Sequence, residues 1–312
     1  MRYLVARARG ERGPRAVRHA LRGIDLAITQ GSIIALVGAN GSGKSTLIRL
    51  MGGAEPPTEG AVRLRGLDPR RASARARLGV AFQSPSLDPL LTIRENLRLH
   101  GRLYAMSQAD IESATRRHAE SLGVAERLDD RVGALSGGLA RRTDLARVLL
   151  TDPDIVLLDE PSASLDAESR RELAALIRRM RDDSGATVVL STHLLDEVRE
   201  ADRVIVLHDG AITLDLSADA WQNRTQQSRL RVSRIDAGGD DARVAEIVER
   251  FHLRPQPTPD GGWTVPILDD QRGAALAHAF AERGVAFEIG APRIEDLVLT
   301  ASHHERRERD EP

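Results

Sequence analysis

The sequence contains no cysteine, and only 3% of its residues are aromatic. The absence of cysteine excludes disulfide bonds, thiol catalysis and thiolate metal sites. Because aromatic side chains are scarce, Leu, Val, Ile and Ala must fill the core. No uninterrupted apolar run approaches the length that spans a bilayer, so we expect any work at a membrane to depend on a second chain that supplies the span.

A surplus of charge of one sign is also missing, since 45 basic residues face 46 acidic ones and the net charge is −1. A charge this close to zero argues against a dedicated nucleic-acid-binding protein. Lysine is almost absent, because Lys44 is the only lysine in the chain and every other Lys-or-Arg position holds arginine. The length of 312 residues suggests one large domain or two.

The single lysine lies in a glycine-rich stretch, GANGSGKST at residues 38–46, which fits the pattern G-x-x-x-x-G-K-[ST]. An apolar run before it predicts a buried strand, and helical spacing after it predicts a helix that ends at a glycine pair. In that context the backbone N–H groups of the loop and helix point at an anion. Lysine suits the loop because its compact ammonium reaches the β- and γ-phosphates, where the planar fork of arginine would clash. The predicted phosphate-binding residues are Gly38, Asn40, Gly41, Ser42, Gly43, Lys44, Ser45 and Thr46.

Polar residues follow four apolar segments that we predict to be parallel strands, at residues 33–37, 78–82, 154–158 and 186–192. Ligands of open α/β sheets bind outside the carboxyl ends of the strands. We therefore expect one site to contain the groups that follow these segments, which are the phosphate loop, Gln83, Asp159, Glu160 and His193.

These groups match the needs of phosphoanhydride hydrolysis, which requires charge neutralisation and an oriented water. Glu160 is predicted to be the base or the group that orients the water, and His193 to donate a hydrogen bond to the γ-phosphate. Gln83 offers an amide to the metal or to the water. The predicted catalytic residues are Glu160, His193 and Gln83, and the predicted Mg²⁺ ligands are Ser45, Gln83 and Asp159.

With these residues in view, the sequence resembles the ATPase subunit of ATP-binding cassette (ABC) transporters over roughly residues 20–215. The matching stretches are GANGSGKST (38–46, Walker A), AFQSPSLDPLLTIRENL (81–97, Q-loop region), LSGGLARR (135–142, signature), IVLLDEP (155–161, Walker B), SASLD (162–166, D-loop) and STHLLDE (191–197, switch histidine). The resemblance implies ATP as the substrate, Mg²⁺ as the cofactor, and a head-to-tail homodimer that sandwiches two nucleotides. It also assigns to the nucleotide site Ser136, Gly137, Gly138 and Asp166.

The sequence departs from the family pattern in two places. The fifth signature residue, usually glutamine, is Leu139, whose apolar side chain offers no amide to nucleotide or partner. The family tends to stack adenine on an aromatic residue upstream of Walker A, and residues 7–23 offer only Arg12, Arg15 or His19. An arginine plane is a possible substitute, by stacking or by a cation–π contact.

The predicted fold is an α/β P-loop NTPase, an ABC cassette with a mostly parallel sheet core and a helical subdomain, followed by a smaller C-terminal α+β domain. The C-terminal element order βαββαβ favours a ferredoxin-like domain. The predicted divisions are an ATP-binding domain at 1–222 with its helical subdomain at about 84–150, an accessory domain at 223–302 and a disordered tail at 303–312.

The function we predict is ATP hydrolysis that powers an export-type ABC transporter through a separately encoded membrane-spanning permease. The expected location is the cytoplasmic face of the cell membrane, as a peripheral protein without nucleic-acid partners. The export assignment rests on the ending GAPRIEDLVLTAS, which resembles the tail of drug-resistance exporters of the daunorubicin type. Two alternatives stay open: a soluble ABC ATPase that acts on ribosomes or DNA, and an importer ATPase.

Overall fold

The computed structural model describes residues 2–4, 17–163, 165–193, 195–225, 229–232, 241–253, 255–258, 261–267 and 270–290. The chain divides into two compact units, Met1–Ile212 and Thr213–Pro312. Residues 291–302, which hold most of the ending GAPRIEDLVLTAS, and the tail at 303–312 lie outside the described residues.

A six-stranded sheet forms the centre of the first unit, with the strand order β4-β5-β6-β3-β7-β8, and its last strand continues past the end of that unit. The strands are β3 (Ile33–Val37), β4 (Leu78–Ala81), β5 (Ile155–Asp159), β6 (Thr187–Thr192), β7 (Arg203–His208) and β8 (Ala211–Ser217). The pairs from β4 to β7 are all parallel. The four strands predicted to carry polar groups at their ends are therefore consecutive neighbours, and their carboxyl ends share one edge of the sheet.

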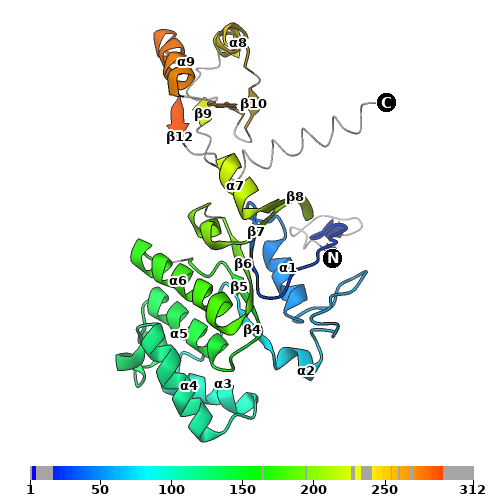
Figure 1. The fold of residues 1–312 in the computed structure, drawn as a ribbon, viewed down its shortest axis with the longest axis vertical. Coiled ribbons are helices and arrows are strands. Elements are labelled where there is room, and N and C mark those ends of the chain that lie inside the picture. Colours follow the sequence, from blue (N-terminus) through cyan, green and yellow to red (C-terminus); the bar gives the residue numbers. More distant parts are fainter. Residues whose placement is uncertain are drawn as a thin grey trace, which may run out of the picture. The chain divides into compact units, whose positions relative to one another are not determined.

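The core lies on both faces of this sheet, because every residue of β3 and β6 is buried. Helix α1 (Lys44–Met51) contacts β5 and β6, and helix α6 (Ala167–Ser184) contacts β6 and β3. Figure 1 shows α1 on one side of the strands and α6 on the other. Continuous apolar strands with helices on both faces are what an all-parallel core requires.

The helical subdomain comprises α3 (Ile93–Leu103), α4 (Gln108–Ser121) and α5 (Gly137–Leu149), which contact one another. Short 3-10 turns lie between α4 and α5. The remaining elements of the first unit are α2 (Ala72–Arg75), η1 (Ala125–Arg127), η2 (Val132–Ala134), η3 (Leu195–Glu200) and the antiparallel strands β1 (Arg2–Leu4) and β2 (Val17–His19).

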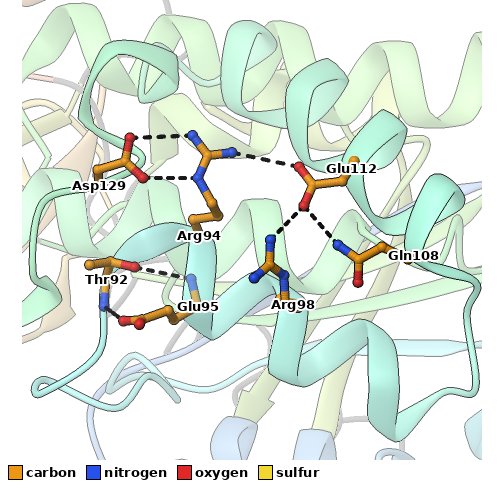
Figure 2. A network of polar contacts seen from close by, with 7 residues as sticks. All are labelled: Thr92, Arg94, Glu95, Arg98, Gln108, Glu112 and Asp129. Carbon is orange, nitrogen blue, oxygen red and sulfur yellow. Dashed lines mark hydrogen bonds and ion pairs between the residues drawn. The ribbon is translucent and has the colours of Figure 1, made fainter.

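Charged contacts fix the start of α3 to its neighbours (Figure 2). Thr92 caps the helix in a capping box with Glu95, each side chain accepting the backbone N–H of the other residue. Arg94 pairs with Asp129 at 2.9 Å and with Glu112 of α4 at 3.6 Å. The cap satisfies backbone donors that a helix start leaves free, and the arginine joins α3 to two further segments.

The second unit contains a four-stranded antiparallel sheet in the order β10-β11-β9-β12. Its elements are α7 (Ala218–Thr225), β9 (Arg229–Val232), α8 (Asp241–Arg250), β10 (Gln256–Pro257), β11 (Trp263–Pro266), α9 (Asp270–Glu282) and β12 (Glu288–Gly290). Residues of α8, of α9 and of the strands share one apolar core, in which Phe280 and Ile247 are fully buried. From β9 to β12 the order is βαββαβ, as the sequence predicts.

Candidate functional site

Two positions in the loop between β3 and α1 accept only glycine. A Cβ atom on Gly38 would lie 2.3 Å from the carbonyl oxygen of Leu207. Gly43 has φ of 109° and would place a Cβ atom 2.8 Å from the carbonyl oxygen of Ala20. The tight loop therefore lies close to the backbone of neighbouring segments, and α1 begins directly after it at Lys44.

Lys44 lies inside this loop, and its side chain is only 4% exposed. Its ammonium donates to the carbonyl oxygens of Gly38 at 2.7 Å and Ala39 at 3.1 Å. Burial lowers the pKa of Lys44 from its ordinary value, while the carboxylates of Glu160 and Asp159 act in the opposite direction. The cation is thus the positive counterpart of the acidic residues at the end of β5.

Asp159, the last residue of β5, joins three of the site's segments through one oxygen. Its Oδ1 accepts from Ser45 Oγ at 3.0 Å and from Ser191 Oγ at 2.6 Å. Ser191 Oγ in turn accepts the backbone N–H of Glu160 at 2.9 Å. The chain of contacts runs from α1 through β5 to β6, and it fixes the position of the backbone N–H of Glu160.

Glu160 has an unusual backbone, with φ of 46° in the left-handed region. A non-glycine residue there costs about 1–3 kcal/mol, and such residues gather at functional sites. Its side chain is 14% exposed and its Oε1 lies 3.7 Å from Nδ1 of His193, which is 50% exposed. The two predicted catalytic residues therefore lie side by side at the edge of the sheet.

Gln83 follows β4 by two residues, and its side chain is exposed. Within the described part of the chain, no hydrogen bond joins it to Ser45, Asp159 or Glu160. The structure thus places Gln83 just beyond the end of β4, the strand next to β5, but does not bring it into the hydrogen-bonded group around Asp159.

The signature stretch forms the N-terminus of α5. Ser136 is the N-cap, and its Oγ accepts the backbone N–H of Leu139 at 3.4 Å. Ser136 and Gly137 are exposed, while Gly138 and Leu139 are half-buried. Helix α5 is thirteen residues long, and its exposed N-terminus presents free backbone N–H groups to an anion.

Asp166 also caps a helix in this chain. Its Oδ1 accepts the backbone N–H of Ser169 at 2.8 Å at the start of α6. That hydrogen bond, followed by one from the Ser169 side chain, lowers the pKa of Asp166. Among the adenine-contact candidates, His19 ends β2 and is exposed, whereas Arg12 and Arg15 lie outside the described residues.

Two buried residues of the site were missed from the sequence. Ser191 is 0% exposed and connects Asp159 to Glu160. The signal for it is a hydroxyl near the carboxyl end of a strand whose middle residues, 188–190, are apolar. Arg141 is 3% exposed and donates to the carbonyl oxygens of Asp159 and Pro161 on either side of Glu160. Nothing distinguishes it from the many other arginines of the sequence.

The oxygens of Ser45 and Asp159 suit a divalent cation. They lie 3.0 Å apart, and a hydroxyl and a carboxylate are the kinds of oxygen donor that Mg²⁺ accepts alongside phosphate oxygens. The glycine loop, the start of α1 and Lys44 suit the phosphates themselves. The residues present therefore fit a nucleoside triphosphate with its metal ion.

Comparison with known proteins identifies the family. Residues 21–163 match the family described as ABC transporter. The aliphatic sulfonates import ATP-binding protein SsuB of Pseudomonas putida is 36% identical over 258 residues, which cover 82% of this chain and 89% of that protein. The chain belongs to the ABC transporter ATP-binding proteins. It is therefore an ATP-binding subunit, an ATPase whose activity is coupled to transport.

Other ABC transporter ATP-binding proteins match over different shares of their length. The Nod factor export ATP-binding protein I of Paraburkholderia xenovorans is 39% identical over 191 residues, covering 60% of this chain and 62% of that protein. A solved dimer of the ATP-binding cassette MJ0796, in a post-hydrolysis state bound to ADP and Pi, has a TM-score of 0.63 and 27% identity. It covers 70% of this chain and 96% of the solved one. Among the described residues, no helix of this ABC ATPase is long and apolar enough to cross a membrane.

Proposed function

We propose that the edge of the sheet around Asp159 hydrolyses ATP at a site assembled by two copies of this chain. The observation that carries the proposal is the chain of contacts from Ser45 through Asp159 and Ser191 to the backbone of Glu160. It puts the end of the phosphate loop and the start of Glu160 in one rigid arrangement. The dimeric structure of the similar cassette MJ0796 supports a homodimer.

The roles of the residues follow from their chemistry. The loop amides and Lys44 bind the phosphates, and Ser45 and Asp159 would hold Mg²⁺, which supplies charge neutralisation when bound. Glu160 accepts a proton from the attacking water or orients it, and His193 beside it donates to the γ-phosphate. Gln83 offers its amide to the metal or to the water. Ser136, Gly137 and Gly138 bind the nucleotide held by the partner copy, and Asp166 contributes to the same nucleotide site.

The proposed partner is a separate membrane-spanning permease, which places the chain at the cytoplasmic face of the membrane as a peripheral protein. The names of the relatives favour import, because SsuB is named for the import of aliphatic sulfonates. Further relatives are named for methionine import and for sulfate and thiosulfate import. Import is therefore better supported than the export that the C-terminal stretch suggests.

Export by a transporter of the drug-resistance type is the second candidate function, for one specific reason. The Nod factor export ATP-binding protein I matches at 39% identity. The direction is tested with the permease that co-purifies with this chain, by measuring whether ATP drives a radiolabelled solute into or out of inside-out vesicles. Uptake into such vesicles indicates export, and release from loaded ones indicates import.

We further propose that residues 223–302 form an accessory domain of ferredoxin-like fold. The strand order β10-β11-β9-β12 and the βαββαβ element order support it. Two helices packed on one antiparallel sheet form a separate core, as an independent domain requires. Its expected role is regulation or dimer contact.

The Glu160→Gln variant tests the proposed site. We expect it to keep ATP binding, to lose turnover by at least about 100-fold, and to run as a homodimer in gel filtration with ATP. The reason is that an amide of the same shape keeps the contacts but cannot accept the proton. A Glu168→Gln change, at an exposed residue in the first turn of α6, is the matched control and should leave turnover unchanged. A Glu160→Gln protein that hydrolyses ATP normally would contradict the assignment.

A further inference from the structure

Arg141 occupies a position that the roles proposed above do not explain. It lies one turn into α5, and its side chain is 3% exposed. Its guanidinium donates to three backbone carbonyl oxygens on two other segments: Nε to Pro161 at 3.0 Å, Nη2 to Asp159 at 2.9 Å, and Nη1 to Phe82 at 2.5 Å.

Each of these three carbonyl groups is next to a residue proposed to act on ATP. Phe82 directly precedes Gln83, while Asp159 and Pro161 are the two neighbours of Glu160. A single buried side chain on the signature helix therefore holds the backbone on both sides of the proposed base and the backbone before Gln83.

The peptide between Asp159 and Glu160 is held from both of its polar atoms. Its oxygen accepts from Arg141, and its N–H donates to Ser191 Oγ at 2.9 Å. Because a peptide unit is planar, fixing both atoms fixes its orientation. Glu160 follows with φ of 46°, a conformation that persists only where the surroundings impose it. Arg141 supplies part of that constraint.

A buried carboxylate balances the charge of this arginine. Asp144, one turn further along α5 and 0% exposed, lies 3.7 Å from Nη1 of Arg141. It also accepts from Arg147 Nε at 2.8 Å and from the backbone N–H of Ser86 at 3.1 Å. Burial lowers the pKa of the Arg141 guanidinium, and the negative charge of Asp144 opposes that shift. The pair is thus neutralised inside the protein, as buried charges require.

We propose that Arg141 is a positioning residue for ATP hydrolysis: it ties the signature helix to the backbone around Glu160 and before Gln83. The proposal rests on the catalytic roles proposed above for these two residues. A planar guanidinium has five donors in fixed directions, so it can serve three carbonyl groups at once. The ammonium of a lysine keeps the charge but not this geometry. Through this side chain, a displacement of the signature helix displaces the proposed base.

The test compares Arg141→Gln with Arg147→Gln. Arg147 is the matched control, because it is also largely buried on α5 and also pairs with Asp144, but its further contact is the carbonyl oxygen of Val80 within β4. Arg141→Gln is expected to lower kcat by about 100-fold, the loss typical of a misplaced catalytic group. For the same variant, the Kd for ADP should stay within about threefold, because the phosphate loop is untouched. Arg147→Gln should lower the Tm to a similar extent while kcat stays within about threefold.

If Arg141→Gln does not fold, the proposal is tested with Arg141→Lys, because the lysine keeps the buried charge pair. Its kcat should remain at least about tenfold below wild type. The proposal is overturned if Arg141→Lys has the wild-type kcat, or if kcat and ADP affinity fall together in both glutamine variants. A normal rate in Glu160→Gln instead overturns the proposed role of the base, whereas a slow Glu160→Gln with a normal Arg141→Gln overturns only the present inference.

Discussion

The ammonium of Lys44 donates to two carbonyl oxygens of its own loop, and the side chain is 4% exposed. The loop around it lies close against neighbouring backbone, since a Cβ atom on Gly38 would lie 2.3 Å from the carbonyl oxygen of Leu207. A guanidinium is wider, so Lys44→Arg should abolish ATP hydrolysis although the charge is kept. Steady-state phosphate release measures this outcome, with a loss of at least about 100-fold expected.

The matched control for this change is Arg49→Lys, the same exchange in reverse on the same helix. Arg49 is 43% exposed and pairs with Glu55 only at 4.0 Å. Surface pairs of this kind contribute about 0–1 kcal/mol, so turnover should not change. Turnover within threefold of wild type for Lys44→Arg would mean that only the charge of the lysine matters.

The residues that sequence could identify are those whose spacing along the chain carries their chemistry. Lys44 and Ser45 follow from the loop pattern, and Asp159 from its place after an apolar run. Ser191 and Arg141 could not be identified in this way, because their roles depend on which atoms of other segments the fold brings beside them. An arginine that binds three carbonyl groups looks in sequence like any other arginine of an amphipathic helix.

At the scale of elements, α3 presents a titratable group to β4 and α5. His100 is largely buried in a cavity of about 170 Å³ that Leu78, Phe82 and Arg147 also line. Its ring lies 4.8 Å from that of Tyr104. Burial, with a smaller contribution from the positive charge of Arg147, lowers the pKa of His100 to about 4.

This shift predicts a loss of stability in acid. An unfolded histidine binds a proton below pH of about 6.5, whereas the folded one stays neutral down to about pH 4. The unfolded state therefore binds more protons in this window, and the free energy of unfolding falls as the pH falls through it, by about 3 kcal/mol in all. His100→Phe should flatten this slope in urea denaturation series between pH 4.5 and 7.5.

An exposed histidine is the control for this experiment. His208, at the end of β7, is 46% exposed, and His208→Gln should keep the slope of the wild-type protein. If His100→Phe and wild type show the same pH dependence, the histidine is not held neutral by its surroundings.

Elements with a strong periodic signal were predictable and their ends were less so. The predicted strand 33–37 is β3 itself, since five consecutive apolar residues between polar ones leave little choice. The strand predicted at 78–82 ends at Ala81, and the carbonyl oxygen of the next residue, Phe82, accepts from Arg141. Asp209 and Gly210 both have positive φ, as the two-residue hairpin turn requires.

At the scale of the whole molecule, the question is whether the boundary between the two parts falls inside β8 or after it. The division into compact units falls after Ile212, inside β8, whereas the sequence places it after residue 222, within α7. As a strand of the six-stranded sheet, β8 adjoins β7. A strand that is cut loses its ladder hydrogen bonds, so we propose that the cassette needs all of β8.

Two shortened chains distinguish these boundaries. A chain that ends at Asn223 keeps β8 whole and lacks the core of the C-terminal sheet, so it should bind ATP with a Kd within about threefold of the full chain. A chain that ends at Ile212 cuts β8 after two of its residues, leaves most of β7's outer edge unpaired and should melt at a lower temperature. Circular dichroism melts and nucleotide titrations measure both. Equal Tm values for the two would place the boundary at Ile212, and loss of nucleotide binding in a folded chain ending at Asn223 would show that the C-terminal residues contribute to the ATP site.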